Sequence, residues 1–288
     1  MIALFRVEFA KATKRTRTLA ALGLAVGIPI LVGIADKARG NHVGNGDRGP
    51  GGDGLFRLAR QTGLVLPGVA LTLMSAFFLV VIVAMFAGDT IAGEAATGNL
   101  RYLLLRPVRR GRLLAAKSLV AFVYAWLMTI AVTVSALVIG VALFGWHPVN
   151  LLTLFADGRV VRIPAGLGVV VNPGRLVLDL LLSTAYVAFS MSALVAIGVF
   201  FSTITDSAAG AIAGAVGVYI VSDIFGAVTP LGVLRYGLPT WYSDAWQSLF
   251  EQNHLSHDML PGAIVQVVWT AVFLALAGWW FARKDIAS

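Results

Sequence analysis

Long apolar runs separated by short polar segments dominate the chain. Six of these runs are long enough to cross a hydrocarbon core, which needs about 20 mostly apolar residues. They cover residues 19–35, 64–87, 118–144, 176–201, 207–228 and 262–282. Polar residues gather between the runs and do not alternate with apolar ones at the period of a surface helix or strand. The pattern predicts an all-α integral membrane protein with six transmembrane helices.

The composition agrees with this prediction. Hydrophobic residues make up 58% of the chain and charged residues 12%, whereas a soluble domain carries roughly 25% charged residues. Only Asp179 and Asp223 place a charge inside the six runs. A charge at the centre of a bilayer costs about 2.5 to 3.5 kcal/mol, so membrane crossing demands this distribution. The chain contains no cysteine, which excludes a disulfide framework and thiol catalysis.

The basic residues indicate an orientation. Segments 1–17, 88–117 and 283–288 hold most of the 22 lysines and arginines, and all three lie on one side if there are six spans. Loops rich in Lys and Arg stay in the cytoplasm, so both termini are predicted to be cytoplasmic and segments 36–63 and 229–261 extracytoplasmic. The net charge of +8 then faces anionic lipid headgroups, and we expect no nucleic-acid partner.

The N-terminal segment, residues 1–17, has an amphipathic pattern. Ile2, Phe5 and Phe9 share one face of a helix, and charged residues occupy the other faces. This pattern is typical of a helix that lies in the headgroup layer of a membrane. A frayed basic tail is the alternative.

The loop between the second and third spans, residues 88–117, is neither a minimal turn nor a tail. Leu100, Leu103 and Leu104 form an apolar ridge on a short helix. Arg106 ends that helix, and Pro107 starts a new direction. We expect a short amphipathic helix lying across the cytoplasmic ends of the bundle.

The residue types needed for catalysis are missing. Gly93 and Gly98 have the spacing that opens a Walker A motif, but Asn99 and Leu100 stand where Lys and Ser or Thr are required. All four histidines lie in predicted outside loops, without a strong zinc signature. HExxH and GxSxG motifs are absent from the sequence. We therefore expect no catalytic residue, metal or cofactor on this chain.

The 88–117 loop resembles that of the ABC-2 family of exporter permeases. A Gly-Glu pair, a later Gly, a Leu-Arg pair, a Leu-rich turn and an Arg-Pro-Val-x-Arg segment recur in that family. Their counterparts here are Gly93, Glu94, Gly98, Leu100, Arg101, residues 103–105, Arg106, Pro107, Val108 and Arg110. The whole chain is similar as well, with a basic N-terminal segment, six spans and the stretch 238–246 before the last span.

The resemblance implies an ABC-2 exporter fold with a cytoplasmic coupling helix between helices 2 and 3. That helix would dock on a separate ATP-binding subunit, which would bind the ATP and Mg. The residues assigned to coupling are Gly93, Glu94, Gly98, Leu100, Arg101, Leu104, Arg106, Pro107 and Arg110. Glu94 and Arg101 are the candidates for the docking contact. The alternative is that the Arg cluster only anchors the loop to anionic lipid.

Two features at the predicted outer side are candidates for a substrate site or a gate. Asp223 lies inside a span and either touches a cationic substrate, pairs with Arg235 or is solvated in an outer vestibule. Trp241, Tyr242 and Trp246 are typical of an interfacial aromatic belt on short re-entrant helices. A gate for substrate is the alternative for these aromatic residues.

Together these observations predict the permease subunit of an ATP-driven exporter in a bacterial cytoplasmic membrane, paired with a second copy or a related permease. Few fixed charges line the spans, which favours a hydrophobic or amphiphilic substrate. A stand-alone secondary transporter or channel is the main alternative, although it predicts a repeat symmetry or ion-binding groups at the midplane. A non-transporting membrane assembly factor is the third class.

Overall fold

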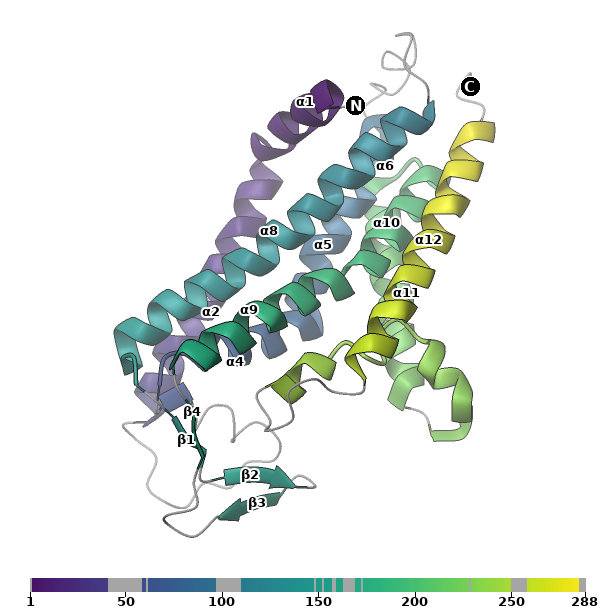
Figure 1. Cartoon of the computed structure of the whole chain (residues 1–288). Helices are drawn as coiled ribbons and strands as arrows, with labels where there is room; N and C mark the ends of the chain where they lie inside the picture. The colour runs from purple at the N-terminus through teal and green to yellow at the C-terminus, as the bar shows by residue number, and fades with distance from the viewer. Residues whose placement is uncertain are drawn as a thin grey trace.

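The computed structural model describes residues 2–40, 59–60, 62–96, 110–147, 149–151, 153–156, 159–162, 169–171, 173–227, 229–249 and 258–284. Within these residues, six helical spans are long and apolar enough to cross a membrane. They form one bundle (Figure 1). The prediction of six transmembrane helices is confirmed.

The first two spans follow a short N-terminal helix. That helix, α1, covers Ile2–Thr13, and α2 (Thr16–Gly40) forms the first span after a two-residue turn. The second span consists of α4 (Leu66–Leu73), the π-helical turn η1 (Met74–Phe78) and α5 (Leu79–Gly88). The short helix α6 (Ala92–Ala96) follows α5 after a turn. It opens the segment that the sequence assigns to coupling.

The third span is the long helix α8 (Arg110–Phe144). The sequence places the start of this span at residue 118, because hydrophobicity falls at Lys117. The structure continues the helix eight residues further, since a helix can leave the hydrocarbon and satisfy its own backbone hydrogen bonds. Arg110 and Lys117 are therefore residues of α8 and do not belong to a loop.

The remaining spans pack around α5 and α8. The fourth span bends at Met191 between α9 (Pro173–Ser190) and α10 (Ser192–Ile204). The fifth and sixth spans are α11 (Ala208–Ala227) and α12 (Met259–Arg283). A Cβ atom on Gly198 of α10 would lie 2.6 Å from the Cβ of Ala87. This glycine permits the close approach of α10 to α5 in the centre of the bundle.

The loop between α8 and α9 contains short strands. β1 (Val149–Leu151) pairs with β4 (Val169–Val171), and β2 (Thr153–Ala156) pairs with β3 (Arg159–Arg162), both in antiparallel register. The all-α prediction is therefore wrong for this loop, although it holds for the spans. Valine-rich segments outside the hydrocarbon can pair as strands in water, and they are too short to stand out against the long apolar runs.

The two ends of the bundle differ in what they carry. Both chain termini, α1 and α6 lie at one end, which we call the terminal end (Figure 1). The four strands lie at the other end, which we call the hairpin end, together with the 3-10 helices η2 (Thr229–Gly237) and η3 (Ala245–Leu249). The described residues of the basic segments 1–17, 88–117 and 283–288 lie at the terminal end, whose cytoplasmic location stays a prediction from charge.

Candidate functional site

Helix α6 begins on a serine of a different span. The hydroxyl oxygen of Ser202, in α10, accepts hydrogen bonds from the backbone N–H groups of Ile91 at 2.9 Å and Ala92 at 2.8 Å. The first N–H groups of a helix have no partner within the helix, so a side-chain oxygen is needed there. Ser202 is fully buried. Through this contact α10 determines where α6 starts.

Glu94 of α6 lies in a buried group of charges. One of its carboxylate oxygens is 2.6 Å from the Nζ of Lys11 and 2.8 Å from the Nζ of Lys117. Lys117 also donates a hydrogen bond of 2.8 Å to a carboxylate oxygen of Glu8. We call these four residues the ion-pair cluster. It joins α1, α6 and α8, which lie far apart in the sequence.

The cluster is charged and electrically balanced. Burial raises the pKa of Glu94, but the ammonium groups of Lys117 and Lys11 outweigh it and hold that pKa below its ordinary value. Two carboxylates then face two ammonium groups. Buried charges are tolerated only when they are paired in this way. Glu94 and Lys117 are 2% and 5% exposed, so neither is available as a docking contact for another protein.

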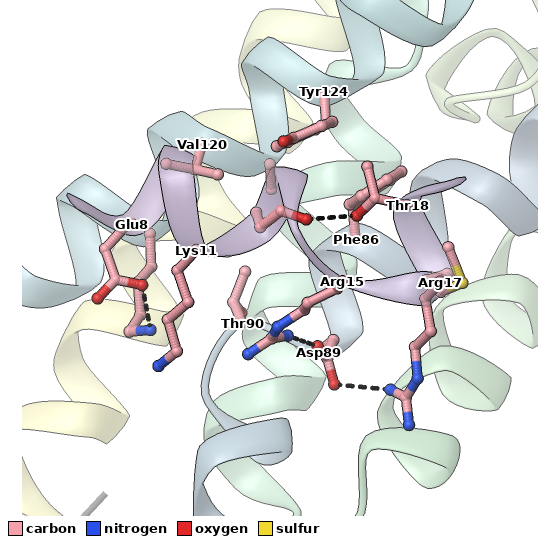
Figure 2. A pocket seen from close by; sticks show the side chains of 14 residues that line it. Glu8, Lys11, Arg15, Arg17, Thr18, Phe86, Asp89, Thr90, Val120 and Tyr124 are labelled. Atoms are coloured by element: carbon pink, nitrogen blue, oxygen red, sulfur yellow. Dashed lines mark hydrogen bonds and ion pairs between the residues drawn. The ribbon is translucent and has the colours of Figure 1, made fainter. Parts of the chain in front are cut away.

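A second charged contact lies beside the cluster, at the end of α5 (Figure 2). Asp89 pairs with Arg15 and also accepts a hydrogen bond of 3.0 Å from Arg17. Cations near a helix C-terminus also interact favourably with the helix dipole. A Cβ on Gly93 would lie 2.2 Å from a carboxylate oxygen of Asp89. Glycine at position 93 therefore lets α6 lie against the end of α5.

The apolar face of α1 packs on the bundle. The ring of Phe9 stacks on Tyr124 of α8 at 5.3 Å, and Phe86 of α5 stacks on Tyr124 at 4.5 Å. Phe5 stacks in turn on Phe9. Phe9, from the face that the sequence assigns to the membrane interface, thus contacts α8. Aromatic pairs of this kind fix one helix against another.

A small cavity lies between α1, the start of α2, α5 and α8. Its volume is about 60 Å³, and its lining includes Arg15, Asp89, Lys117 and Tyr124 (Figure 2). Sites for small molecules usually measure about 300 to 1,000 Å³. This cavity can hold a few water molecules beside the charged groups, and it is too small to be a substrate site.

The predicted coupling residues divide into two groups. Gly93, Glu94 and Arg110 are described by the structure. The remaining predicted coupling residues lie outside the described residues, namely Gly98, Leu100, Arg101, Leu104, Arg106 and Pro107. Arg110 opens α8 and donates a hydrogen bond of 2.9 Å to the backbone carbonyl of Lys284. It thus connects the end of the coupling loop to the C-terminal end of α12.

The end of α12 is connected to the α10–α11 turn as well. The Nζ of Lys284 donates to a carboxylate oxygen of Asp206 at 2.7 Å and to the carbonyl oxygen of Thr203 at 3.1 Å. Sequence reasoning missed these contacts, as it missed Ser202 and Lys117. The sequence does contain one indication of the ion-pair cluster, because Glu8 is the only acidic residue in the basic segment 1–17.

At the hairpin end, a pair between Asp223 and Arg235, one of the three alternatives for Asp223, does not form. Asp223 is exposed on α11. The guanidinium of Arg235 lies over the ring of Trp241 at 4.7 Å and that of Tyr236 at 5.1 Å. A cation over an aromatic face gains electrostatic attraction without a carboxylate partner. Among the described residues, Asp223 and Arg235 therefore form no ion pair with each other.

The aromatic stretch 238–246 caps the bundle. Trp246 is fully buried in the core, so for this residue the expected place in a surface belt is wrong. Trp241 and Tyr242 are half-buried, and the backbone carbonyl of Tyr242 accepts a hydrogen bond of 2.9 Å from the hydroxyl of Tyr186 in α9. Gln266 of α12 donates to the carbonyl of Pro239 at 2.6 Å. Composition alone cannot distinguish a belt tryptophan from one that the loop folds inward.

Comparison with known proteins gives the family. The family model described as "ABC-2 family transporter protein" matches residues 8–286, which is nearly the whole chain. A search of curated proteins finds no match. The match covers all six spans, the α6 segment and the hairpin end. The chain therefore belongs to the ABC-2 family of transporter proteins and is a transporter permease.

Proposed function

We propose that this permease is the membrane subunit of an exporter driven by ATP that a separate subunit hydrolyses. One observation carries the proposal: α6, at the entry to the predicted coupling loop, is joined to three helices of the bundle. Ser202 of α10 caps it, and Glu94 pairs with residues of α1 and α8. A force applied to this loop by a neighbouring subunit would therefore act on the bundle through charged and hydrogen-bonded contacts.

The sequence supports a separate ATPase. The loop lacks the Lys and Ser or Thr of a Walker A motif, so ATP and Mg belong on the partner. Because Glu94 is buried, we assign docking to the basic residues of the loop, Arg101 and Arg106, and give Glu94 the role of positioning α6. Charged residues at the rim of an interface determine its register.

The substrate class that fits is hydrophobic or amphiphilic. Asp179 lies within 3.9 Å of Arg175 on the same helix, and Asp223 lies near the end of its span. Two hydroxyls of the spans pair with each other inside the bundle, those of Thr133 and Thr184 at 3.0 Å. Six helices leave little interior for a channel of their own, and the cavity beside Asp89 is too small for a substrate. We therefore place the path between two permeases, either two copies or two related chains.

The proposal is tested by co-expression with a candidate ATPase subunit. We expect the ATPase to copurify with the permease, and Arg101→Glu or Arg106→Glu to abolish copurification and the permease-dependent increase in ATP turnover. Arg48→Glu, in the predicted outer loop, is the matched charge reversal and should change neither measurement. Flux through the purified permease in liposomes, driven by an ion gradient without ATP, would contradict the proposal and support a secondary transporter.

A further inference from the structure

The ion-pair cluster has a geometry that goes beyond holding α1 to the bundle. Lys117 is its centre, because its single ammonium group lies 2.8 Å from carboxylates on two different helices, Glu8 of α1 and Glu94 of α6. Lys11 of α1 contacts the same oxygen of Glu94. We propose that Glu8, Lys11 and Lys117 form a clamp that holds α6, so that α1, α6 and α8 move as one unit when the coupling loop is displaced.

Helix α6 depends on such contacts for its position. It has only five residues, and a helix that short gains too few backbone hydrogen bonds to be stable alone. Its start is held by Ser202, and Glu94 in its middle is held by the clamp. Without the clamp, α6 would lose its connection to α1 and α8 and would keep only its packing against α10, α11 and the end of α5. Its orientation relative to α1 and α8 would then be free to vary.

The clamp is also stiffer than a surface ion pair. Glu94 and Lys117 are almost completely buried, and Glu8 is 10% exposed. Electrostatic contacts strengthen when water is excluded, and a buried charge that loses its partner is strongly disfavoured. The stacked rings of Phe9 and Tyr124 hold α1 against α8 on the same side. Separation of α1 from α6 and α8 therefore breaks several contacts at once.

The other faces of α1 provide a contrast. Arg6 of α1 and Lys14, just after its end, are exposed, and they suit contact with anionic lipid headgroups. Glu8, in contrast, contacts Lys117 of α8, and Lys11 contacts Glu94 of α6. A helix that served only as a lipid anchor would need no acidic residue. Glu8 therefore has a positioning role in the clamp, which a helix that only binds lipid would not need.

The first test needs the permease alone. The chain has no cysteine, so Ala10→Cys on α1 and Ala96→Cys on α6, both exposed, can carry a pair of spin labels without background. We expect a narrow distance distribution in the otherwise native protein and in Arg6→Gln. We expect a broad distance distribution in Glu8→Gln and in Lys117→Met. Lys117→Arg keeps the positive charge and should again give a narrow distribution. Narrow distributions in both Glu8→Gln and Lys117→Met would overturn the clamp.

Lys11→Gln provides the same test if Lys117→Met does not fold. Lys11 is 43% exposed, and its loss leaves the ammonium group of Lys117 between Glu8 and Glu94. The expected result is again a broadened distribution between the labels on α1 and α6. A distribution as narrow as that of the Arg6→Gln control would count against the clamp.

The role in transmission rests on the proposed function and has its own measurement. In a complex with the ATPase subunit, we expect Glu8→Gln to retain copurification. The permease-dependent ATP turnover should fall about 10-fold, which is the size of effect expected for residues that carry coupling between sites. Arg6→Gln should keep full turnover. Full turnover in Glu8→Gln would overturn the role in transmission. A native permease that binds no ATPase would instead overturn the proposed function, and the spin-label result would still decide whether the clamp exists.

Discussion

The two ends of the bundle are held together by different kinds of contact. At the terminal end, ion pairs connect helices that are distant in sequence, through Lys117, Asp89 and Lys284. At the hairpin end, neutral hydrogen bonds from Tyr186 and Gln266 attach the aromatic cap to α9 and α12. Ion pairs act over a longer range and respond to pH and salt, whereas neutral hydrogen bonds are short and directional.

This difference matches the roles that we assign to the two ends. A coupling region must accept displacement by a partner and keep its connections, which ion pairs allow. A cap that closes one end of the bundle needs a constant geometry. Asp36 and Arg60 form an ion pair of 2.7 Å away from the terminal end. Ion pairs are therefore not confined to the terminal end, although they connect more of its helices. Substitutions at the two ends of the bundle test this difference.

The largest effect is expected for Lys117→Met. The substitution leaves Glu8 and Glu94 buried without their shared ammonium group, and removal of one partner of a buried ion pair costs about 3 to 5 kcal/mol. The thermal unfolding midpoint of the purified permease measures this loss. Lys14→Met removes an exposed charge and should cost less than about 0.5 kcal/mol. Equal midpoints for the two variants would show that the cluster contributes little stability.

Gly93→Ala should have the next largest effect. Its Cβ would meet a carboxylate oxygen of Asp89 that Arg15 and Arg17 hold in place, and overpacking of this kind costs about 1 to 3 kcal/mol. Gly111→Ala is the matched control, because a Cβ at position 111 meets nothing within 4 Å. That control should leave the unfolding midpoint unchanged or raise it. A Gly93→Ala protein as stable as the control contradicts the close packing of α6.

Gln266→Met tests the hairpin end. It removes the hydrogen bond to the carbonyl of Pro239 while keeping most of the side-chain volume, and we expect a loss of about 1 kcal/mol. The loss should be the same at low and high salt, because both partners are neutral. The loss in Lys11→Gln, whose side chain is half exposed, should shrink as salt is added. Unfolding midpoints at two salt concentrations distinguish the ends, and similar salt dependence in both variants would contradict the comparison.

The smallest effect is a pH dependence that arises from Glu94. Its pKa in the folded protein lies below the ordinary value of 4.5, so its stabilising contribution is present above that value and is lost as the pH falls through the lower folded pKa. We expect the unfolding midpoint to drop between about pH 5 and pH 3, and this drop to be smaller in Glu94→Gln. An identical drop in both proteins would remove Glu94 as its source.

The sequence singled out some residues of the region that we assign to coupling and missed others for a consistent reason. Gly93 and Glu94 stand out in the sequence through the resemblance of their loop to that of the ABC-2 exporter permeases. Lys117 looks like one more basic residue beside an apolar run, and Ser202 like one more serine in a span. Their importance comes from the helices that they face. Trp246 likewise reads as an interfacial residue until the loop folds it into the core.

The sequence by itself determined the number of spans, the absence of a Walker A motif and the loop that carries the family resemblance. Each of these is a local property, because about 20 neighbouring residues decide whether a segment enters a bilayer. Only the tertiary structure decided the partners of the charges. Lys11 and Glu94 are 83 positions apart, and Glu8 and Lys117 are 109 positions apart. Such pairs depend on how whole helices pack, and no local pattern along the chain records that packing.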